Sequence, residues 1–261
     1  MTEPSGILDC LYVLDGGEAH VEDISQWSPG VDVGRPRVFS GNVYLLRHGT
    51  DWMLWDTGLE EPLITEPGGK VFAHEVRGVL TRTLSSQLDE IGVNPADIGH
   101  LAVSHAHFDH VGNTRLFPHA TWYVQRPEHA AMFGPDFERY GFLPRLYDTL
   151  RHNETVLLDG DHDVFGDGSV RILSTPGHTP GHQSLLVWLP RAGPIVLSGD
   201  LAHFRKNFVN RRVPAFNADA EQTRASMDRI DALVNELEAQ LWINHDYRQS
   251  ATLRRSPTPV R

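Results

Sequence analysis

The stretch SHAHFDHVGN constrains this chain more than any other, because it crowds potential metal ligands into one loop: His105, His107, Asp109 and His110. Positions 105, 107 and 109 alternate and position 110 breaks the alternation, so the loop can direct its side chains toward two points. A zinc ion takes about four nitrogen, sulfur or oxygen ligands. The loop supplies at most two ligands to each of two ions, so the fold must bring further ligands to it from distant segments.

Three residues elsewhere are candidates for those ligands, and each follows an apolar, strand-like run: His178 after VRILSTPG, Asp200 after IVLSG and His245 after LWIN. Functional residues often lie where a strand passes into a loop. Taken singly, a His or Asp in such a position is more often a cap or a turn residue. Taken with the four residues of the loop, the three complete a set of seven.

The length and composition predict one mixed α/β domain over residues 1–261. The chain is 40% apolar, which suffices for one large domain or two small ones. It shows no linker, low-complexity segment or clear repeat, and we expect only the tail at 253–261 to fray. Residues 42–58 read as a β-hairpin, and apolar residues at helical spacing predict helices at 72–91 and 218–240.

The segment from Glu128 to Arg151 is harder to assign; its apolar and aromatic residues are compatible with a partly exposed helical structure.

The charge balance argues against a nucleic-acid or anionic-membrane partner. The formal net charge is −11 and the isoelectric point is about 5.7, and the basic run HFRKNFVNRR is isolated. No apolar run approaches the ~20 residues of a membrane span.

The single cysteine, Cys10, rules out an internal disulfide and fits a reducing compartment. The N-terminal residues lack a basic stretch followed by a long apolar core, so no signal peptide is expected. We therefore expect a cytoplasmic protein in which Cys10 is a small buried apolar residue and not a nucleophile.

Taken in order, the motifs H-x-H-x-D-H, TPGH, SGD and a late His resemble those of the metallo-β-lactamase superfamily, and LWDTG (54–58) matches the first motif of that superfamily. Within it, the chain is most similar to the N-acyl homoserine lactonases, the quorum-quenching lactonases. The segments SHAHFDHVGN, YVQRPEH, STPGHTPGHQSLLV and SGDLAHFRKNF carry this likeness. The resemblance implies a four-layer αβ/βα sandwich with a dinuclear metal site at one edge.

The resemblance also implies a role for each candidate ligand. One metal ion would take His105, His107 and His178, the other would take Asp109, His110 and His245, and Asp200 would bridge both. Asp56 would orient a ligand imidazole, as a partner of a metal-bound His normally does. The ions are expected to be two divalent cations, most simply Zn²⁺, with Mn, Fe and Co as alternatives.

The implied reaction is hydrolysis of the ester bond of a small neutral lactone with an acyl chain, by attack of a hydroxide that bridges the two ions. Asp109 and His203 are the candidate catalytic residues. Related lactonases carry a tyrosine at the position of His203, three residues after the bridging aspartate. An imidazole can still donate a hydrogen bond but titrates near neutrality, so the change leaves lactone hydrolysis plausible and opens the question of substrate range. Tyr247 is a second possible source of a phenol.

The substrate pocket is expected to include Phe108, inside the metal loop, and Phe216. Trp27, Phe39 and Phe72 can line the same approach but fit the core equally well.

Other readings stay open at this stage. The metal motifs do not separate a homoserine lactonase from a pyridoxolactonase, an aryl esterase or organophosphate hydrolase, or a thioesterase of this fold. A non-catalytic metal-binding protein is less consistent with a complete set of seven ligands. A homodimer is compatible with the sequence.

Overall fold

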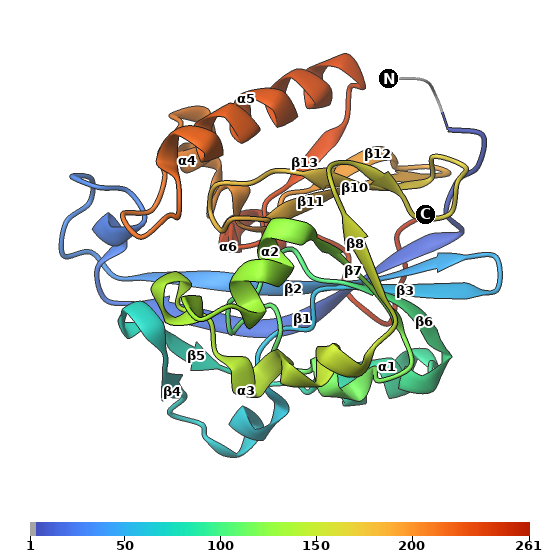
Figure 1. Ribbon diagram of the computed structural model, residues 1–261, viewed down its shortest axis with the longest axis horizontal. Coiled ribbons are helices and arrows are strands. Elements are labelled where there is room, and N and C mark those ends of the chain that lie inside the picture. Colours follow the sequence, from blue (N-terminus) through green and yellow to red (C-terminus); the bar gives the residue numbers. More distant parts are fainter. Residues whose placement is uncertain (1–3) are drawn as a thin grey trace.

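The computed structural model describes residues 4–261, and two β-sheets form its centre (Figure 1). The first sheet has eight strands in the order β4-β5-β1-β2-β3-β6-β7-β8. These are β1 (Cys10–Val21), β2 (Arg37–His48), β3 (Asp51–Trp55), β4 (Lys70–Val71), β5 (Arg77–Val79), β6 (Ile98–Ala102), β7 (Thr121–Gln125) and β8 (Thr155–Leu158). Strands β1 to β3 pair antiparallel, whereas β3, β6, β7 and β8 pair parallel.

The second sheet has five strands in the order β13-β12-β11-β10-β9. These are β9 (His162–Asp163), β10 (Val170–Ser174), β11 (Gln183–Leu189), β12 (Gly193–Leu197) and β13 (Gln240–Trp242). Apolar side chains of both sheets, such as Leu46 on β2 and Leu185 on β11, share one buried cluster. The sheets therefore pack face to face.

Helices cover the outer face of each sheet (Figure 1). Those on the first sheet are α1 (Leu84–Ile91), α2 (Arg126–Phe133) and α3 (Pro144–Tyr147), and those toward the second are α4 (Arg205–Val209) and α5 (Ala220–Glu236). A short helix, α6 (Tyr247–Ser250), follows β13. This order of layers is the predicted αβ/βα sandwich, so the fold class expected from the sequence is confirmed. No helix among residues 4–261 is both long and apolar enough to cross a membrane.

Short 3-10 turns complete the list of elements: η1 (Ile24–Gln26), η2 (Glu61–Thr65), η3 (Ala73–Glu75), η4 (Pro95–Asp97), η5 (Thr114–Leu116), η6 (Phe137–Tyr140), η7 (Asp148–His152) and η8 (Gly199–Leu201).

The hairpin predicted at 42–58 is confirmed, because β2 and β3 pair antiparallel across a tight turn at Gly49 and Thr50. The helix predicted at 218–240 is α5, which begins after Asp219; that side chain accepts a hydrogen bond from Gln222 N and caps the helix. Cys10 is buried, as expected.

The long helix predicted over 72–91 is wrong in its first half. Residues 77–79 form β5 and pair with β1, and α1 begins only after Thr83, whose side chain caps it. The apolar residues of this segment do face the core, but the edge of β1 needs backbone partners, and β5 supplies them.

The tail is also not frayed. Val260 forms a β-bridge with Leu11, and Ser256 N donates to Val13 O. Leu253 and Val260 pack against the core between the sheets. Backbone pairing and burial therefore hold the segment at 253–261 that the sequence predicted to be loose. The segment 128–151 resolves into most of α2, η6, α3 and most of η7.

Candidate metal centre

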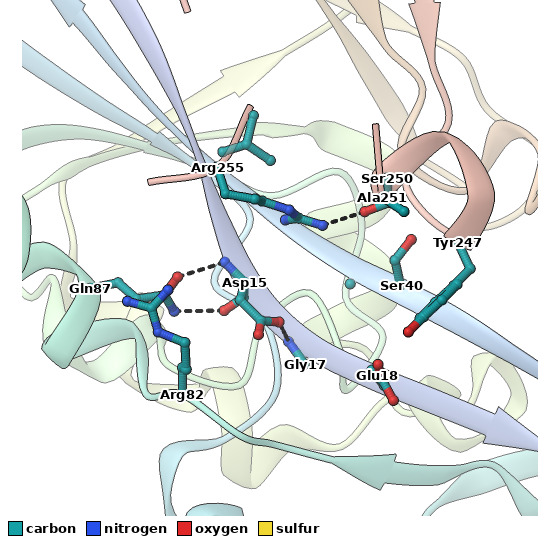
Figure 2. Close-up of a pocket in the computed structure, with 12 residues that line it drawn as sticks. Asp15, Gly17, Glu18, Ser40, Arg82, Gln87, Tyr247, Ser250, Ala251 and Arg255 are labelled. Carbon is teal, nitrogen blue, oxygen red and sulfur yellow. Dashed lines mark hydrogen bonds between the residues drawn. The ribbon is translucent and has the colours of Figure 1, made fainter. Parts of the chain in front are cut away.

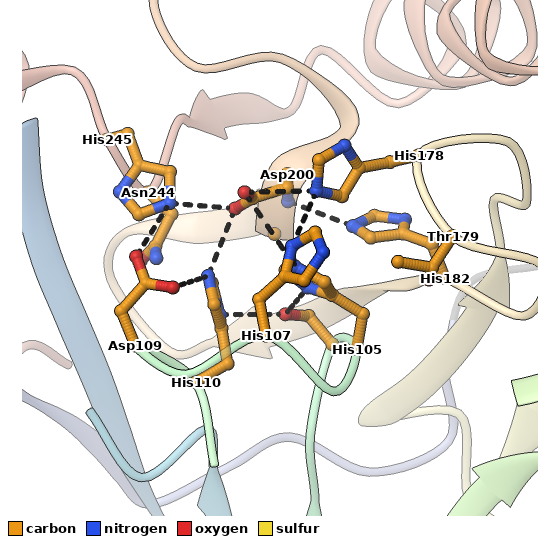
Figure 3. A network of polar contacts seen from close by, with 12 residues as sticks. His105, His107, Asp109, His110, His178, Thr179, His182, Asp200, Asn244 and His245 are labelled. Atoms are coloured by element: carbon orange, nitrogen blue, oxygen red, sulfur yellow. Dashed lines mark hydrogen bonds and ion pairs between the residues drawn. The ribbon is translucent and has the colours of Figure 1, made fainter. Parts of the chain in front are cut away.

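The candidate ligands all lie where strands end at one edge of the sandwich. His105 to His110 follow β6, His178 lies between β10 and β11, Asp200 lies in η8 directly after β12, and His245 follows β13. Figure 3 shows these side chains pointing toward one another around Asp200. The structure thus brings together all seven residues that the sequence singled out.

The first donor group consists of His105, His107, His178 and one oxygen of Asp200. Nε2 of His105 lies 2.7 Å from Nδ1 of His107, and Nε2 of His178 lies 3.1 Å from the same atom. Oδ2 of Asp200 lies 3.4 Å from Nε2 of His178. Three ring nitrogens and a carboxylate oxygen therefore converge on one point.

The second donor group consists of Asp109, His110 and His245. Nε2 of His245 lies 2.9 Å from Asp200 Oδ1, and Nε2 of His110 lies 3.2 Å from it. Asp109 approaches the same two nitrogens at 3.7 and 3.8 Å. Asp200 thus turns Oδ2 toward the first group and Oδ1 toward the second.

The outward ring nitrogen of each histidine in the two groups has an oxygen partner. The pairs are His105 Nδ1 with Ser104 Oγ at 3.1 Å, His107 Nε2 with Tyr140 O at 2.8 Å, His110 Nδ1 with Asp56 Oδ2 at 2.9 Å, His178 Nδ1 with Asn217 Oδ1 at 3.0 Å and His245 Nδ1 with Ser40 O at 2.7 Å. A proton on the outward nitrogen leaves the inward nitrogen with its lone pair, as metal ligation requires. Asp56 also accepts from Ser104 N at 2.6 Å, so it fixes both the loop and the imidazole.

Burial and charge tune the two groups differently. Burial lowers the pKa of His107 to about 4 and the pKa of His105 and His178 well below the usual value, so these rings are neutral. Burial also opposes the charged form of His110, but Asp56 and Asp200 outweigh it and hold the pKa of His110 above its usual range. Burial likewise opposes ionisation of Asp200, but the surrounding histidines hold its pKa well below the usual value.

The donor set fits divalent metal ions. Within residues 4–261, the buried atoms His110 Nε2 and Asp200 Oδ1 have no hydrogen-bond partner, and leaving buried polar atoms unsatisfied is costly. A cation held by the second donor group would satisfy both atoms. Imidazole and carboxylate donors suit Zn, Mn, Fe and Co.

The metallo-beta-lactamase superfamily model matches residues 36–237. The chain belongs to this superfamily. Among its relatives, the N-acyl homoserine lactonase AttM of Rhizobium johnstonii is 29% identical over 95% of this chain and 97% of that protein. The AttM of Azorhizobium caulinodans is 34% identical over 66% of this chain and 67% of that protein. A solved N-acyl homoserine lactone hydrolase, with the product N-hexanoyl-L-homoserine at its catalytic metal centre, superimposes with a TM-score of 0.86 at 26% identity. The match covers 98% of this chain and all of that one.

His203 differs from the other histidines of this superfamily site. Its Nε2 lies 3.1 Å from Asp200 Oδ2 and its ring stacks on His245 with centroids 5.3 Å apart, so it does not point to solvent. Its Nδ1 is buried and has no hydrogen-bond partner among the described residues. Asp200, His203 and His245 form a third set of converging donor atoms. The outer partner that orients the other five imidazoles is thus missing for His203.

Aromatic side chains line the pocket that opens beside the two donor groups. Phe108, Phe216, Trp27 and Phe39 line it. Phe72 is not among the lining residues but stacks on Phe108 with ring centroids 4.2 Å apart. Figure 2 shows Tyr247 in a separate cavity with Asp15, Glu18 and Arg255, and it is 48% exposed. The suggestion that Tyr247 supplies a phenol to the site is therefore wrong.

Sequence reasoning left His182 without a role. His182 Nδ1 donates to Thr175 O at 2.9 Å, and its Nε2 accepts the backbone N–H of Asp200 at 2.9 Å. It thereby fixes the backbone of the residue shared by both groups. The repeat in TPGHTPGH was the available signal, since the second PGH carries this histidine.

Proposed function

We propose that the protein is a lactonase that hydrolyses the ester bond of N-acyl homoserine lactones at a centre of two divalent metal ions. The observation that carries the proposal is the arrangement around Asp200, whose two oxygens face two separate donor groups beneath an apolar pocket. The relatives that are N-acyl homoserine lactonases support the substrate class.

Seven residues would hold the ions: His105, His107 and His178 one of them, Asp109, His110 and His245 the other, with Asp200 shared. A pair of divalent ions, most simply Zn²⁺, supplies a Lewis acid for the lactone carbonyl and makes hydroxide available near neutral pH. Asp56 and Ser40 O keep the imidazoles of His110 and His245 oriented.

The remaining polar groups of the pocket would handle protons. The Asp109 side chain is 13% exposed and lines the pocket, so its carboxylate can take a proton from the attacking water and return it to the ring oxygen that leaves. His203 lines the same pocket and would bind the reacting ester group. This assigns Asp109 and His203 as the catalytic residues.

The apolar wall would bind the acyl chain. Phe108 and Phe216 line the pocket, and each methylene that leaves water contributes about 0.8 kcal/mol. A few added carbons therefore change affinity by more than about tenfold until the groove ends. The substrate amide should survive, because an amide carbonyl is less electrophilic and its nitrogen is a poor leaving group.

Mass spectrometry of the product tests the reaction directly. Metal-loaded protein and an N-acyl homoserine lactone should give a product heavier by one water with the acyl chain still attached, and a pH-stat should record one acid equivalent per turnover. Free homoserine lactone with a fatty acid would identify an acylase. Fast cleavage of another ester or lactone, with no turnover of any acyl homoserine lactone, would assign the protein to a different hydrolase of this fold.

We also propose that the enzyme works in the cytoplasm, where the buried thiol of Cys10 stays reduced. Cell fractionation followed by a lactonase assay checks this location.

A further inference from the structure

Glu128 is a buried carboxyl group that the reaction does not use. It lies in the first turn of α2, and 1% of its surface is exposed. No cation neighbours its carboxylate in the part of the chain that the structure describes; its partners are two backbone amides and a hydroxyl. A buried carboxylate without a counter-ion is costly. Burial raises the pKa of Glu128 to about 7, against three hydrogen bonds that favour the charged form.

The three hydrogen bonds join two loops of the metal centre. Glu128 Oε1 accepts from the N–H of Ala106, which lies between His105 and His107, at 3.0 Å. Oε2 accepts from Thr179 Oγ1 and from Gly181 N, both at 2.8 Å, in the loop that carries His178. One loop follows β6 of the first sheet, and the other connects β10 and β11 of the second. The carboxyl group of Glu128 therefore connects a loop of the first sheet to a loop of the second.

The second loop passes unusually close to α2. A Cβ placed on Gly181 would lie 2.4 Å from Glu128 N, a distance that side chains do not tolerate. Gly181 permits this approach because it has no side chain. The backbone of α2 at Glu128 and the backbone of the His178 loop at Gly181 are therefore in close contact.

The first donor group needs such a link. Its three imidazole nitrogens face one another at 2.7 and 3.1 Å, so a small shift of either loop changes the distances between them. His105 and His107 come from one loop and His178 from the other, so the distance between them depends on contacts between the two loops, such as those of Glu128 and the hydrogen bond from Gln183 N to Ser104 O.

We propose that Glu128 is a positioning residue that holds His178 against His105 and His107 and so sets the metal affinity of the first donor group. The inference rests on the proposed function only in taking these residues as metal ligands. Outer partners of metal ligands typically contribute about 10- to 100-fold to metal affinity.

Titration of the metal-free protein with Co²⁺, followed by visible absorption, tests the proposal without an activity assay. Wild type should bind two equivalents. Glu128→Gln keeps the shape of the side chain but sets an amide N–H₂ against an N–H donor on one of the loops. It should weaken one equivalent by about tenfold or more and leave the other within about twofold.

Two double mutants identify which of the two donor groups loses affinity for Co²⁺. In the His245→Ala background, which keeps the first donor group, Glu128→Gln should weaken the remaining equivalent. In the His178→Ala background, which impairs the first group, it should change little. The coupling between Glu128 and His178 is then read from the cycle. Equal weakening in both backgrounds, or none in either, overturns the proposal.

A matched control separates positioning from general loss of stability. Glu60 is also a buried glutamate, but its carboxylate binds Arg145 and Lys70. Glu60→Gln should lower the melting temperature and leave both Co²⁺ equivalents unchanged; the same loss of one equivalent as in Glu128→Gln would contradict a specific role for Glu128.

Thr179→Val, which removes one hydrogen bond, serves if Glu128→Gln does not fold. It should weaken the same equivalent by about two- to tenfold, and an unchanged affinity would overturn the proposal. A wild type that binds two Co²⁺ ions but opens no acyl homoserine lactone refutes the proposed function and leaves this inference standing.

Discussion

The first donor group meets Asp200 through three neutral imidazoles, whereas the second adds a carboxylate, Asp109, and histidines whose pKa is raised by the acids around them. Their supports differ as well. Glu128 ties together the two loops of the first group. In both groups each imidazole also has its own oxygen partner, as Asn217 is for His178 and Asp56 is for His110. The comparison teaches that an oxygen partner orients each ring in both groups, and that the first group has in addition a carboxyl group that links the two loops carrying its ligands.

The largest effect is expected for Asp200→Asn, which acts on both donor groups at once. Asp200→Asn takes away the charge that both groups share, so both should lose affinity for a divalent ion by more than the about 100-fold that an outer partner contributes. Elemental analysis after dialysis against a weak chelator should find less than one ion per chain. Retention of two ions per chain would show that Asp200 is not the bridge.

The next largest effect is expected for His245→Ala, which should remove the ion of the second donor group and leave that of the first. This substitution removes a ligand of the second group only, and the three histidines of the first group stay in place. We expect about one ion per chain by the same elemental analysis, because the second site keeps only Asp109, His110 and the shared Asp200 and so falls short of the about four donors that zinc takes. Two ions per chain in the variant would show that His245 is not a ligand, and one ion per active wild-type chain, unchanged by the substitution, would refute the dinuclear assignment.

Asp56→Asn should lower the metal affinity of the second donor group without abolishing binding there. Asp56 has a φ of 61°, which Asn tolerates better than most residues, so the backbone should be preserved. The amide loses the charge that orients His110, and we expect a loss of about 10- to 100-fold in affinity for one ion. Competition with a chelator of known affinity measures it. An equal loss at both sites would mean that Asp56 supports the loop as a whole through Ser104.

The smallest effect concerns His203, which contacts Asp200 but lacks an outer partner. His203→Ala should keep both ions and slow lactone hydrolysis. A fully engaged oxyanion donor is worth about 2.7–4 kcal/mol, and we expect less here because the ions carry most of the developing charge. His203→Tyr, which restores the residue of the related lactonases, should retain activity. Steady-state kinetics with metal analysis on one sample decides the point: full activity in His203→Ala, or loss of metal, contradicts it.

The candidate site could be predicted from the sequence to a large extent because its ligands lie in short motifs. Alternation within residues 105–110 and the strand ends before His178 and His245 are local properties of the chain, and the structure places these residues together. The hairpin of β2 and β3 was predictable for the same reason, since two apolar runs and their turn are contiguous.

The errors and omissions all involve contacts between distant segments. Residues 77–79 form a strand and not the predicted helix, because they pair with β1. Val260, in the predicted loose tail, forms a β-bridge with Leu11 near the other end of the chain. Tyr247 lies two residues from His245 but faces another cavity. Glu128 begins the segment 128–151 that the sequence left hard to assign, and its partners lie in two distant loops.

The sequence by itself determined which atoms can bind metal and which family of folds can bring them together, because both depend on residue type and on spacing along the chain. Only the tertiary structure decided that Asp200 divides its oxygens between two groups, that His182 holds its backbone, and that Glu128 links the two sheets at the centre. These arrangements depend on hydrogen bonds between buried groups far apart in sequence. Such groups find partners only after the two sheets have packed and excluded water.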